Sequence, residues 1–245
     1  MISKQRAKFV KSLKLKKYRK KATSFLVEGA KNIIELIHSD YDIEYLFVTE
    51  KFLNAYPNLN ISGINLTVCS EKELESFGTF QSNEYALAVA RMKTKPLDIS
   101  KEKLVLALDD LSDPGNLGTM LRIADWYGLR TVIASKNTAD FYSPKVINAT
   151  MGSFTRVHVH YVNLADFLSG NISHKVYGAV LNGENIHLVE FEFPAILLMG
   201  NESTGINTSL LSIVYKKITI PRIGGAESLN VAVSTAVICD NMLRD

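Results

Sequence analysis

The sequence predicts an α/β protein of two α/β domains, the second of which contains a parallel sheet with helices on both faces. Short apolar runs of strand length alternate with helical patterns along the whole chain. A polar segment that contains Pro96 interrupts this alternation and is the predicted linker. Beyond it the apolar runs are nearly continuous, which is typical of strands buried on both faces. We therefore expect domains at residues 1–95 and 103–245, joined by residues 96–102.

Short local patterns predict each element of the first domain. Basic and apolar residues alternate over residues 3–20, which predicts a short amphipathic helix followed by a basic turn. Glu73 lies three residues after Ser70, the spacing of a capping box at the start of a helix. The other expected elements are strands at 25–27, 43–49, 66–69 and 85–90 and a helix at 30–38.

The second domain continues the alternation with longer helices. The expected strands are 104–108, 131–134, 157–162, 176–181, 196–199 and 218–220. The expected helices are 116–127, 145–153, 208–214 and 229–243. An apolar stripe on the last helix is compatible with either a core or an interface, and it consists of Val231, Val233, Val237, Ile238 and Met242.

Positive charge is concentrated at the N-terminus. Ten of the 28 basic residues lie within the first 21 positions, and the first acidic residue is Glu28. The remaining residues carry 18 basic and 25 acidic side chains, a net charge of −7. This asymmetry favours an N-terminus that binds a polyanion such as RNA, in a salt-sensitive manner. The alternative is a solvated basic helix without a partner.

Composition also narrows the class of protein. No apolar run approaches the roughly 18–20 residues that span a bilayer, and no apolar signal-peptide core follows the basic N-terminus. Cys69 and Cys239 lack the spacing of metal ligands and are expected to be buried thiols. We therefore expect a cytoplasmic protein that does not cross a membrane.

Three short segments in the second domain combine glycine with polar side chains where a predicted strand ends. They are Asp113–Arg122, Met199–Gly205 and Ile220–Ser234. In open α/β sheets, ligands bind beyond the carboxyl ends of the strands. Three such turns in one domain predict a single ligand pocket.

In order and spacing, these segments match the three motifs of the SpoU (TrmH-type) RNA ribose 2′-O-methyltransferases, which residues 103–245 therefore resemble. The resemblance implies a Rossmann-like SPOUT domain with a C-terminal trefoil knot, a feature that general topology rules make rare. It also implies S-adenosylmethionine as cofactor and a homodimer formed through the catalytic domain. The N-terminal quarter resembles the small RNA-binding extension of many members. Since members that act on transfer RNA often lack it, ribosomal RNA of the large subunit is the favoured substrate.

Arg122 matches the arginine of the first motif, which acts on the ribose 2′-hydroxyl together with a substrate phosphate. The cofactor's sulfonium supplies the electrophile, so the protein has to position the hydroxyl and accommodate its proton. An arginine pKa above about 12 makes a literal base role demanding. The resemblance leaves open whether Arg122 is a base or an electrostatic positioner. The alternative is an exposed helix arginine paired with Asp125.

Two further side chains belong to the implied catalytic group. Asn116 matches the asparagine that orients Arg122 or the RNA, although its place at a predicted helix start also suits an N-cap. Glu202 lies in the second motif, where a carboxylate can orient Arg122 through a charge-assisted hydrogen bond. The alternative is a plain loop glutamate.

The remaining implied residues surround the cofactor. Gly200 matches a position where the backbone approaches the cofactor closely, and backbone groups at Ile220 and Leu229 match those that hold the adenosyl group. Ser228 and Asn230, which also belong to the implied catalytic group, match the serine and asparagine of the third motif, which order the pocket and the substrate. Capping of the final helix is the alternative for both.

Other functions receive weaker support. His158 and His160 alternate on a predicted strand without further ligands at suitable spacing, so no metal site is expected. Tyr18 and Phe25 are candidate base-stacking residues beside the basic segment. A catalytically inactive RNA-binding or ribosome-assembly protein with the same fold is the main alternative. A nicotinamide-dependent oxidoreductase is disfavoured, because the glycines after residue 113 do not form Gly-x-Gly-x-x-Gly.

Overall fold

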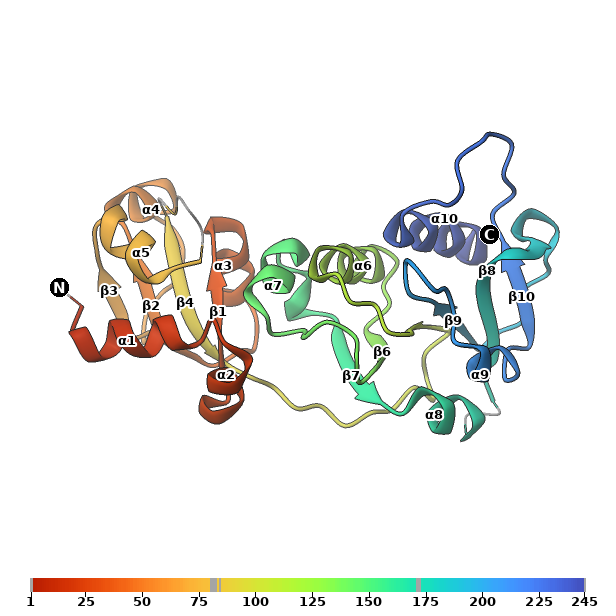
Figure 1. Cartoon of the computed structure of the whole chain (residues 1–245). Coiled ribbons are helices and arrows are strands. Elements are labelled where there is room, and N and C mark those ends of the chain that lie inside the picture. The colour runs from red at the N-terminus through yellow and green to blue at the C-terminus, as the bar shows by residue number, and fades with distance from the viewer. Residues whose placement is uncertain (1, 80–82, 84, 171–172, 245) are drawn as a thin grey trace. The chain divides into compact units, whose positions relative to one another are not determined.

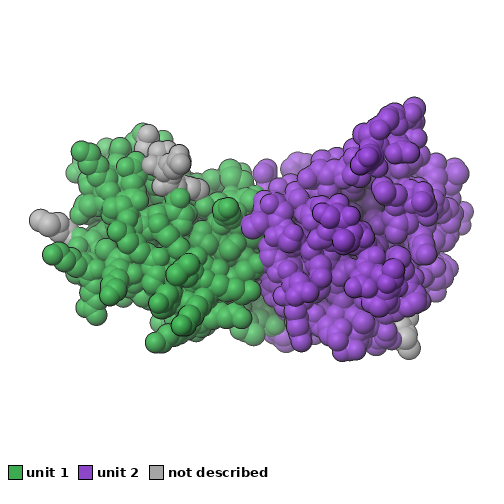
Figure 2. Space-filling view, viewed as in Figure 1, with its two compact units in different colours: residues 1–95, 140–155 green, residues 96–139, 156–245 purple. Residues whose placement is uncertain are grey.

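The computed structural model describes residues 2–79, 83, 85–170 and 173–244. The chain forms two compact units, which Figure 2 shows in different colours. Unit 1 consists of residues 1–95 and 140–155, and unit 2 of residues 96–139 and 156–245. Among the described residues, no helix is long and apolar enough to cross a membrane.

Unit 1 is built on a mixed sheet of four strands in the order β1-β4-β2-β3 (Figure 1). Strand β4 is antiparallel to both β1 and β2, whereas β3 is parallel to β2. The strands are β1 (Ser24–Glu28), β2 (Ile43–Val48), β3 (Leu66–Val68) and β4 (Ala86–Arg91). The helices are α1 (Lys4–Ser12), α2 (Lys16–Ala22), α3 (Ala30–Ile37), α4 (Glu50–Ala55) and α5 (Glu71–Phe77).

The helices of unit 1 pack apolar side chains against this sheet. Val10 and Leu13, at the end of α1, share a core with Leu74 of α5 and Phe47 of β2. Helix α5 begins with the predicted capping box, since the Ser70 hydroxyl accepts the Glu73 N–H and the Glu73 carboxylate accepts the Ser70 N–H. The basic N-terminus is therefore tied to the sheet through the buried face of α1.

A segment from the middle of the chain completes unit 1. Residues 140–155 contain α7 (Pro144–Thr150) and the 3₁₀ turn η1 (Ser153–Thr155), and α7 packs against β1. Phe25 of β1 is fully buried, with its ring beside those of Tyr41, Tyr142 and Phe154. The prediction that Phe25 stacks on RNA bases is therefore wrong, because its ring lies inside the core.

Unit 2 is built on a parallel sheet of six strands in the order β10-β8-β9-β5-β6-β7 (Figure 1). The strands are β5 (Leu104–Leu108), β6 (Thr131–Ser135), β7 (His158–Val162), β8 (Lys175–Asn185), β9 (Ala195–Met199) and β10 (Lys216–Thr219). All residues of β5, β6 and β9 are buried. This arrangement confirms the predicted parallel α/β sheet of the second domain.

Helices cover both faces of this sheet. Figure 1 shows α6 (Pro114–Trp126) and α10 (Val231–Leu243) on one side, and α8 (Leu164–Gly170) and α9 (Thr208–Leu211) on the other. On the α8 and α9 side, Leu168 and Leu210 pack with Val105 and Leu198 of the central strands. Ile99 of the predicted linker joins the same core. A short 3₁₀ turn, η2 (Ile186–Leu188), follows β8.

Several local predictions differ from the structure. A second helix, α2, replaces the predicted basic turn, because the Leu15 carbonyl accepts the N–H groups of Tyr18 and Arg19. Helices α4 and α8 lie where no element was expected, and α9 is shorter than predicted. The two cysteines are buried free thiols, as expected.

Candidate functional site

The three predicted motifs begin where strands β5, β9 and β10 end. These strands belong to one parallel sheet, so their carboxyl ends lie at the same edge. β5 and β9 are neighbours, whereas β8 separates β9 from β10. Segments that begin at residues 113, 199 and 220 thus leave the sheet in the same direction, as expected for a ligand site of an open α/β sheet.

The first motif follows the short loop after β5 and begins α6. Asp113 is the N-cap of α6, and its carboxylate accepts the N–H of Asn116 at 2.7 Å. Pro114 occupies the first helical turn, where the backbone N–H that proline lacks would have no partner within the helix. The prediction of Asn116 as N-cap is therefore wrong: Asp113 caps the helix, which leaves the Asn116 side chain available for other contacts.

Asn116 joins the three motifs. Its Nδ2 donates to Oε1 of Glu202 at 2.9 Å, and its Oδ1 accepts Nδ2 of Asn230 at 3.0 Å. The side chains come from α6, from the loop after β9 and from the start of α10. Each bond uses one end of the Asn116 amide, so the orientation of that amide is fixed by both partners. We call Asn116, Glu202 and Asn230 the amide cluster.

Asn230 has a second role as the N-cap of α10. Its Oδ1 accepts the N–H of Ala232 at 2.9 Å, while its Nδ2 reaches Asn116. The oxygen of the Asn230 amide thus caps α10, while its nitrogen bonds to the site residue Asn116. Ser228 lies in the exposed loop before it and does not cap the helix.

The loop after β9 folds back on itself at Gly200. A Cβ atom at Gly200 would lie 2.3 Å from the backbone carbon of Gly205 and from the backbone nitrogen of Ile206. Asn201 and Gly205 exchange backbone hydrogen bonds, and Gly205 has a positive φ of 70°. Glycine is therefore required at position 200 by the close approach of this loop to itself.

Polar groups at the end of β5 fix the position of the β9 loop. The side-chain amide of Asn201 donates to the Asp110 carbonyl at 2.7 Å, and Oδ2 of Asp109 accepts the Asn207 N–H at 2.7 Å. Asp110 has a left-handed φ of 53°, and its carboxylate accepts the Ser135 hydroxyl at 2.5 Å. Burial raises the pKa of the Asp109 carboxyl, and the Asn207 N–H acts in the opposite direction.

Arg122 lies on α6, less than two turns beyond Asn116, with its side chain exposed. The predicted alternative of an Arg122–Asp125 pair does not form, because Arg156 binds both carboxylate oxygens of Asp125, at 2.8–3.0 Å. Within the described part of the chain no hydrogen bond or ion pair joins Arg122 to Glu202. The guanidinium is thus accessible to a ligand.

The residues implied for cofactor binding lie around the exposed loop between β10 and α10. Ile220 is half-buried, residues 221–230 are exposed, and the Leu229 side chain is 51% exposed. Over the described residues, the N–H groups of 222–229 make no hydrogen bond to other backbone groups. Apolar side chains beside backbone N–H groups that are not used within the fold fit an adenosyl group.

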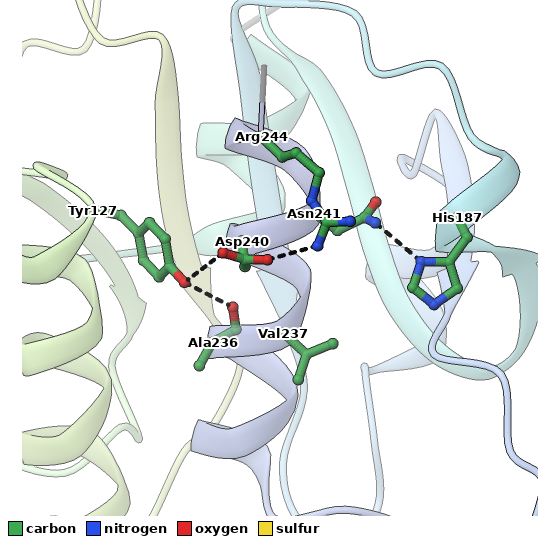
Figure 3. A pocket seen from close by; sticks show the side chains of 7 residues that line it. All are labelled: Tyr127, His187, Ala236, Val237, Asp240, Asn241 and Arg244. Carbon is green, nitrogen blue, oxygen red and sulfur yellow. Dashed lines mark hydrogen bonds and ion pairs between the residues drawn. The ribbon is translucent and has the colours of Figure 1, made fainter.

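An open hollow of about 300 Å³ lies beside α10, at a distance along the helix from Asn230. Figure 3 shows that Tyr127 donates to Asp240, which also pairs with Arg244 at 2.7 Å, and that Asn241 contacts His187. None of the seven residues that line this hollow belongs to the predicted site.

Metal ligands are not gathered in the part of the chain that the structure describes. No group of three His, Cys, Asp or Glu side chains is placed to hold an ion there. His158 and His160 both lie on β7, and burial lowers the pKa of His160. Burial also raises the pKa of Cys69 to about 11 and that of Cys239 to about 12, so both thiols stay protonated at neutral pH.

The fold and the joined motifs are those of an RNA methylase. Residues 103–240 match the SpoU rRNA methylase family, and residues 4–88 match the MRM3-like substrate binding domain. The chain belongs to the SpoU rRNA methylase family. The predicted family is thereby confirmed.

Two curated relatives illustrate the match. The 23S rRNA (guanosine(2553)-2′-O)-methyltransferase RlmP of Bacillus subtilis is 32% identical over 237 residues, which cover 96% of this chain and 94% of the relative. The 23S rRNA (guanosine-2′-O-)-methyltransferase RlmB of Acinetobacter baylyi is 28% identical, with 71% of this chain and 76% of the relative covered.

Solved structures of similar proteins extend over both units. A TrmH-family protein from Porphyromonas gingivalis has a TM-score of 0.87 and 34% identity, covering 99% of this chain and 98% of that one. An AdoMet-bound rRNA methyltransferase from Sinorhizobium meliloti has a TM-score of 0.87 and 26% identity, covering 100% and 96%. The predicted enzyme class and cofactor agree with these findings.

Sequence reasoning missed the groups that hold the motif loops together. Asp109, Asp110 and Asn201 carry the contacts between the ends of β5 and β9. The one signal in the sequence was their position directly after apolar strands. Their partners are backbone groups far away in the sequence, which spacing does not reveal.

Proposed function

We propose that this chain transfers a methyl group from S-adenosylmethionine to the 2′-hydroxyl of a ribose in 23S ribosomal RNA. Its curated relatives with that activity are similar over most of their own length. The observation that carries the proposal is the amide cluster, which links the three motif loops at the carboxyl edge of the sheet. A shared site needs such a link, because each loop supplies only part of it.

Arg122 is the group we place at the reacting end. When bound, the cofactor supplies an electrophilic methyl carbon. The Arg122 guanidinium binds the phosphate beside the target ribose and polarises the 2′-hydroxyl, which lowers the cost of losing its proton. Asn116, held at both ends of its amide, and Glu202 orient the substrate beside it. This division of labour explains why Arg122 has no protein partner in the described structure.

Gly200, Ile220 and Leu229 hold the cofactor in this proposal. Gly200 brings backbone close to the site, and backbone groups of Ile220 and Leu229 meet the adenosyl group. Ser228 acts with Asn230 to order the loop between β10 and α10 when ligands bind. Family membership further supports a trefoil knot in the C-terminal segment, with this loop and α10 in it.

We assign RNA binding to domain 1–95 and methyl transfer to domain 103–245, with 96–102 as the linker. The family match at residues 4–88 supports the first assignment, as does the basic N-terminus. Large-subunit ribosomal RNA is the substrate that the relatives' names favour, and transfer RNA is the less favoured one.

A homodimer that forms through α10 is part of the proposal. Of the apolar stripe on α10, Ile238 and Met242 are buried within the chain, whereas Val233 and Val237 are exposed. Val237 also lines the hollow of Figure 3. Trp126, at the end of the neighbouring helix α6, is 84% exposed, far more than a core tryptophan. Exposed apolar groups on adjacent helices support a protein interface.

Mapping of ribose methylation tests the function. A strain without the gene is expected to lose one 2′-O-methyl group in 23S rRNA, and wild-type protein but not Arg122→Ala restores it. Calorimetric titration with S-adenosylmethionine tests the main alternative, since the absence of detectable binding would favour an inactive ribosome-assembly protein. Sedimentation of Val237→Glu tests the dimer: the variant is expected to be monomeric, and a dimer as stable as wild type would contradict it.

A further inference from the structure

The turn after α1, together with α2, carries a cluster of lysines on unit 1. We call these residues, 13–22, the basic hairpin. Five lysines in it are exposed: Lys14, Lys16, Lys17, Lys20 and Lys21. Two apolar side chains among them are exposed as well, Leu15 at 60% and Tyr18 at 42%. The hairpin contains no acidic residue.

Arg19 is the exception among these cations. Its side chain is only 3% exposed, and its guanidinium makes three hydrogen bonds. Nη1 donates to the carbonyls of Leu13 and Lys14 at 3.0 and 2.8 Å. Nη2 donates to Asp140 Oδ2 at 2.6 Å, in an ion pair across 121 residues of sequence. A buried cation with several partners is held in one geometry.

These contacts determine the shape of the hairpin. The carbonyls of Leu13 and Lys14 lie just past the end of α1, where a helix leaves its last carbonyls without helical partners. Arg19 lies on α2, so its bonds close the turn and set the direction in which α2 leaves α1. Asp140 offsets the buried charge and connects the hairpin to residues 140–155, which belong to the same unit.

Electrostatic repulsion between the lysines of α2 is unfavourable unless an anion binds to them. Lys16 and Lys20, and Lys17 and Lys21, are four residues apart on α2, a spacing at which like charges repel. Holding them side by side is favourable when an anion with repeated charges binds. Tyr18, exposed between them, offers a flat surface for an unstacked base. Lysines with an interleaved aromatic ring match single-stranded RNA better than a duplex, whose bases are covered.

We propose that Arg19 is a positioning residue for RNA: by closing the α1–α2 turn it holds the five lysines and Tyr18 as one preformed docking surface for single-stranded RNA. This inference rests on the proposed function and identifies the part of unit 1 that carries it. The lysines bind phosphates, Tyr18 stacks on a base, and Arg19 touches neither. A preformed surface binds more tightly because less conformational freedom is lost on binding.

The test uses the full chain and a labelled single-stranded oligoribonucleotide of about 20 nucleotides. Arg19→Lys keeps the charge but cannot make the three bonds, so we expect about a tenfold weaker affinity. Lys31→Gln, which removes an exposed charge of unit 1 outside the hairpin, is the matched control and is expected to bind like wild type. Asp140→Asn is expected to weaken binding in the same direction as Arg19→Lys.

Two further measurements separate positioning from a folding defect. Tyr18→Ala and Lys17→Gln alter only exposed side chains and are expected to weaken binding, with the slope of log K against log salt falling by about 0.7 for Lys17→Gln. In methyl transfer, Arg19→Lys is expected to raise the KM for RNA at an unchanged kcat.

The following results overturn the inference: wild-type affinity in Arg19→Lys and Tyr18→Ala, equal affinity for a duplex or for heparin, or tight binding only to anionic vesicles. Failure of the proposed function is a different result, in which wild-type protein methylates no RNA although it binds the oligonucleotide.

Discussion

The two units of this protein present functional groups in opposite ways. In unit 1 the cations that we propose to bind RNA lie on α2 and the turn before it, outside a mixed sheet, and they come from one continuous stretch of sequence. In unit 2 the candidate site lies at the carboxyl edge of a parallel sheet and combines three distant segments. A surface that binds a long anion tolerates the loss of one member, whereas a site that aligns reacting atoms does not. The two units should therefore respond very differently to single substitutions.

The largest effect is expected at Arg122. Arg122→Ala should lower kcat on the order of 10³-fold, because it removes the cation that stabilises charge at the 2′-oxygen. Affinity for S-adenosylmethionine should be unchanged in calorimetry, since Arg122 is not among the groups assigned to the cofactor. Arg130→Ala, which removes an exposed arginine just beyond the same helix, is the control. Turnover near the wild-type rate in Arg122→Ala would remove the basis for its role.

Gly200→Ala should produce the largest change in stability. The new methyl group would meet the backbone of Gly205 and Ile206, so the β9 loop has to move. We expect a loss of about 3 kcal/mol in the free energy of unfolding, measured by denaturant titration. Gly170→Ala is the control, because a Cβ there meets no atom within 4 Å. Equal stability of both variants would show that the loop is less constrained than its contacts indicate.

A smaller effect is expected at Asn116. Asn116→Ala removes the two hydrogen bonds that join the motif loops, each worth about 1 kcal/mol. If both act on the transition state, kcat/KM falls by about 30-fold. Asn58→Ala, an exposed loop position in unit 1, serves as control. An unchanged kcat/KM in Asn116→Ala would mean that the amide cluster is structural only.

Substitutions in unit 1 should change RNA affinity gradually. Lys16→Gln is expected to raise the KM for RNA two- to fivefold and to reduce the salt slope by about 0.7, at constant kcat. Lysines of the same hairpin should have similar and roughly additive effects, measured at several salt concentrations. A sharp loss of kcat from one lysine would contradict the contrast between the units.

The smallest effect concerns pH and Asp109. Burial raises the pKa of this carboxyl in the folded protein above its unfolded value of about 4. Its contribution to stability is therefore fully present below the unfolded pKa and is lost as the pH rises through the folded pKa. Asp109→Asn keeps an acceptor for the Asn207 N–H but does not titrate. The decrease in the free energy of unfolding with rising pH should therefore be smaller in this variant, by about 1 kcal/mol or less. Thermal unfolding of both proteins between pH 4 and pH 8 measures this difference. The same pH dependence of stability in variant and wild type would contradict the prediction.

Much of the fold could be predicted from the sequence because the signals were local. Apolar runs located nearly every strand, and the Ser70 capping box is present as predicted. Helix α2 could not be predicted, because a run of lysines opposes a helix and the stabilising contact of Arg19 with Asp140 is 121 residues away. Phe25 failed as a base-stacking residue for a related reason: two of the three rings beside it, those of Tyr142 and Phe154, come from the distant 140–155 segment.

In the candidate site, the residues could be predicted from the sequence, but several of their hydrogen-bond partners could not. The motif resemblance led to Asn116, Glu202 and Asn230, and the structure joins them directly. The N-cap, however, is Asp113, and Glu202 meets Asn116 where a bond to Arg122 was expected. Which of several neighbouring polar residues forms a given bond depends on the path of the backbone through each turn. Residue spacing alone does not contain that information.

The position of residues 140–155 in the chain has a consequence for synthesis. Helix α7 covers β1, yet it emerges from the ribosome roughly 60 residues after the last strand of unit 1, a delay of several seconds at ordinary translation rates. During that interval the face of β1 that α7 covers in the finished chain has no partner from this segment. Phe25 of β1 acquires the ring of Phe154 as a neighbour only after the later segment has been synthesised.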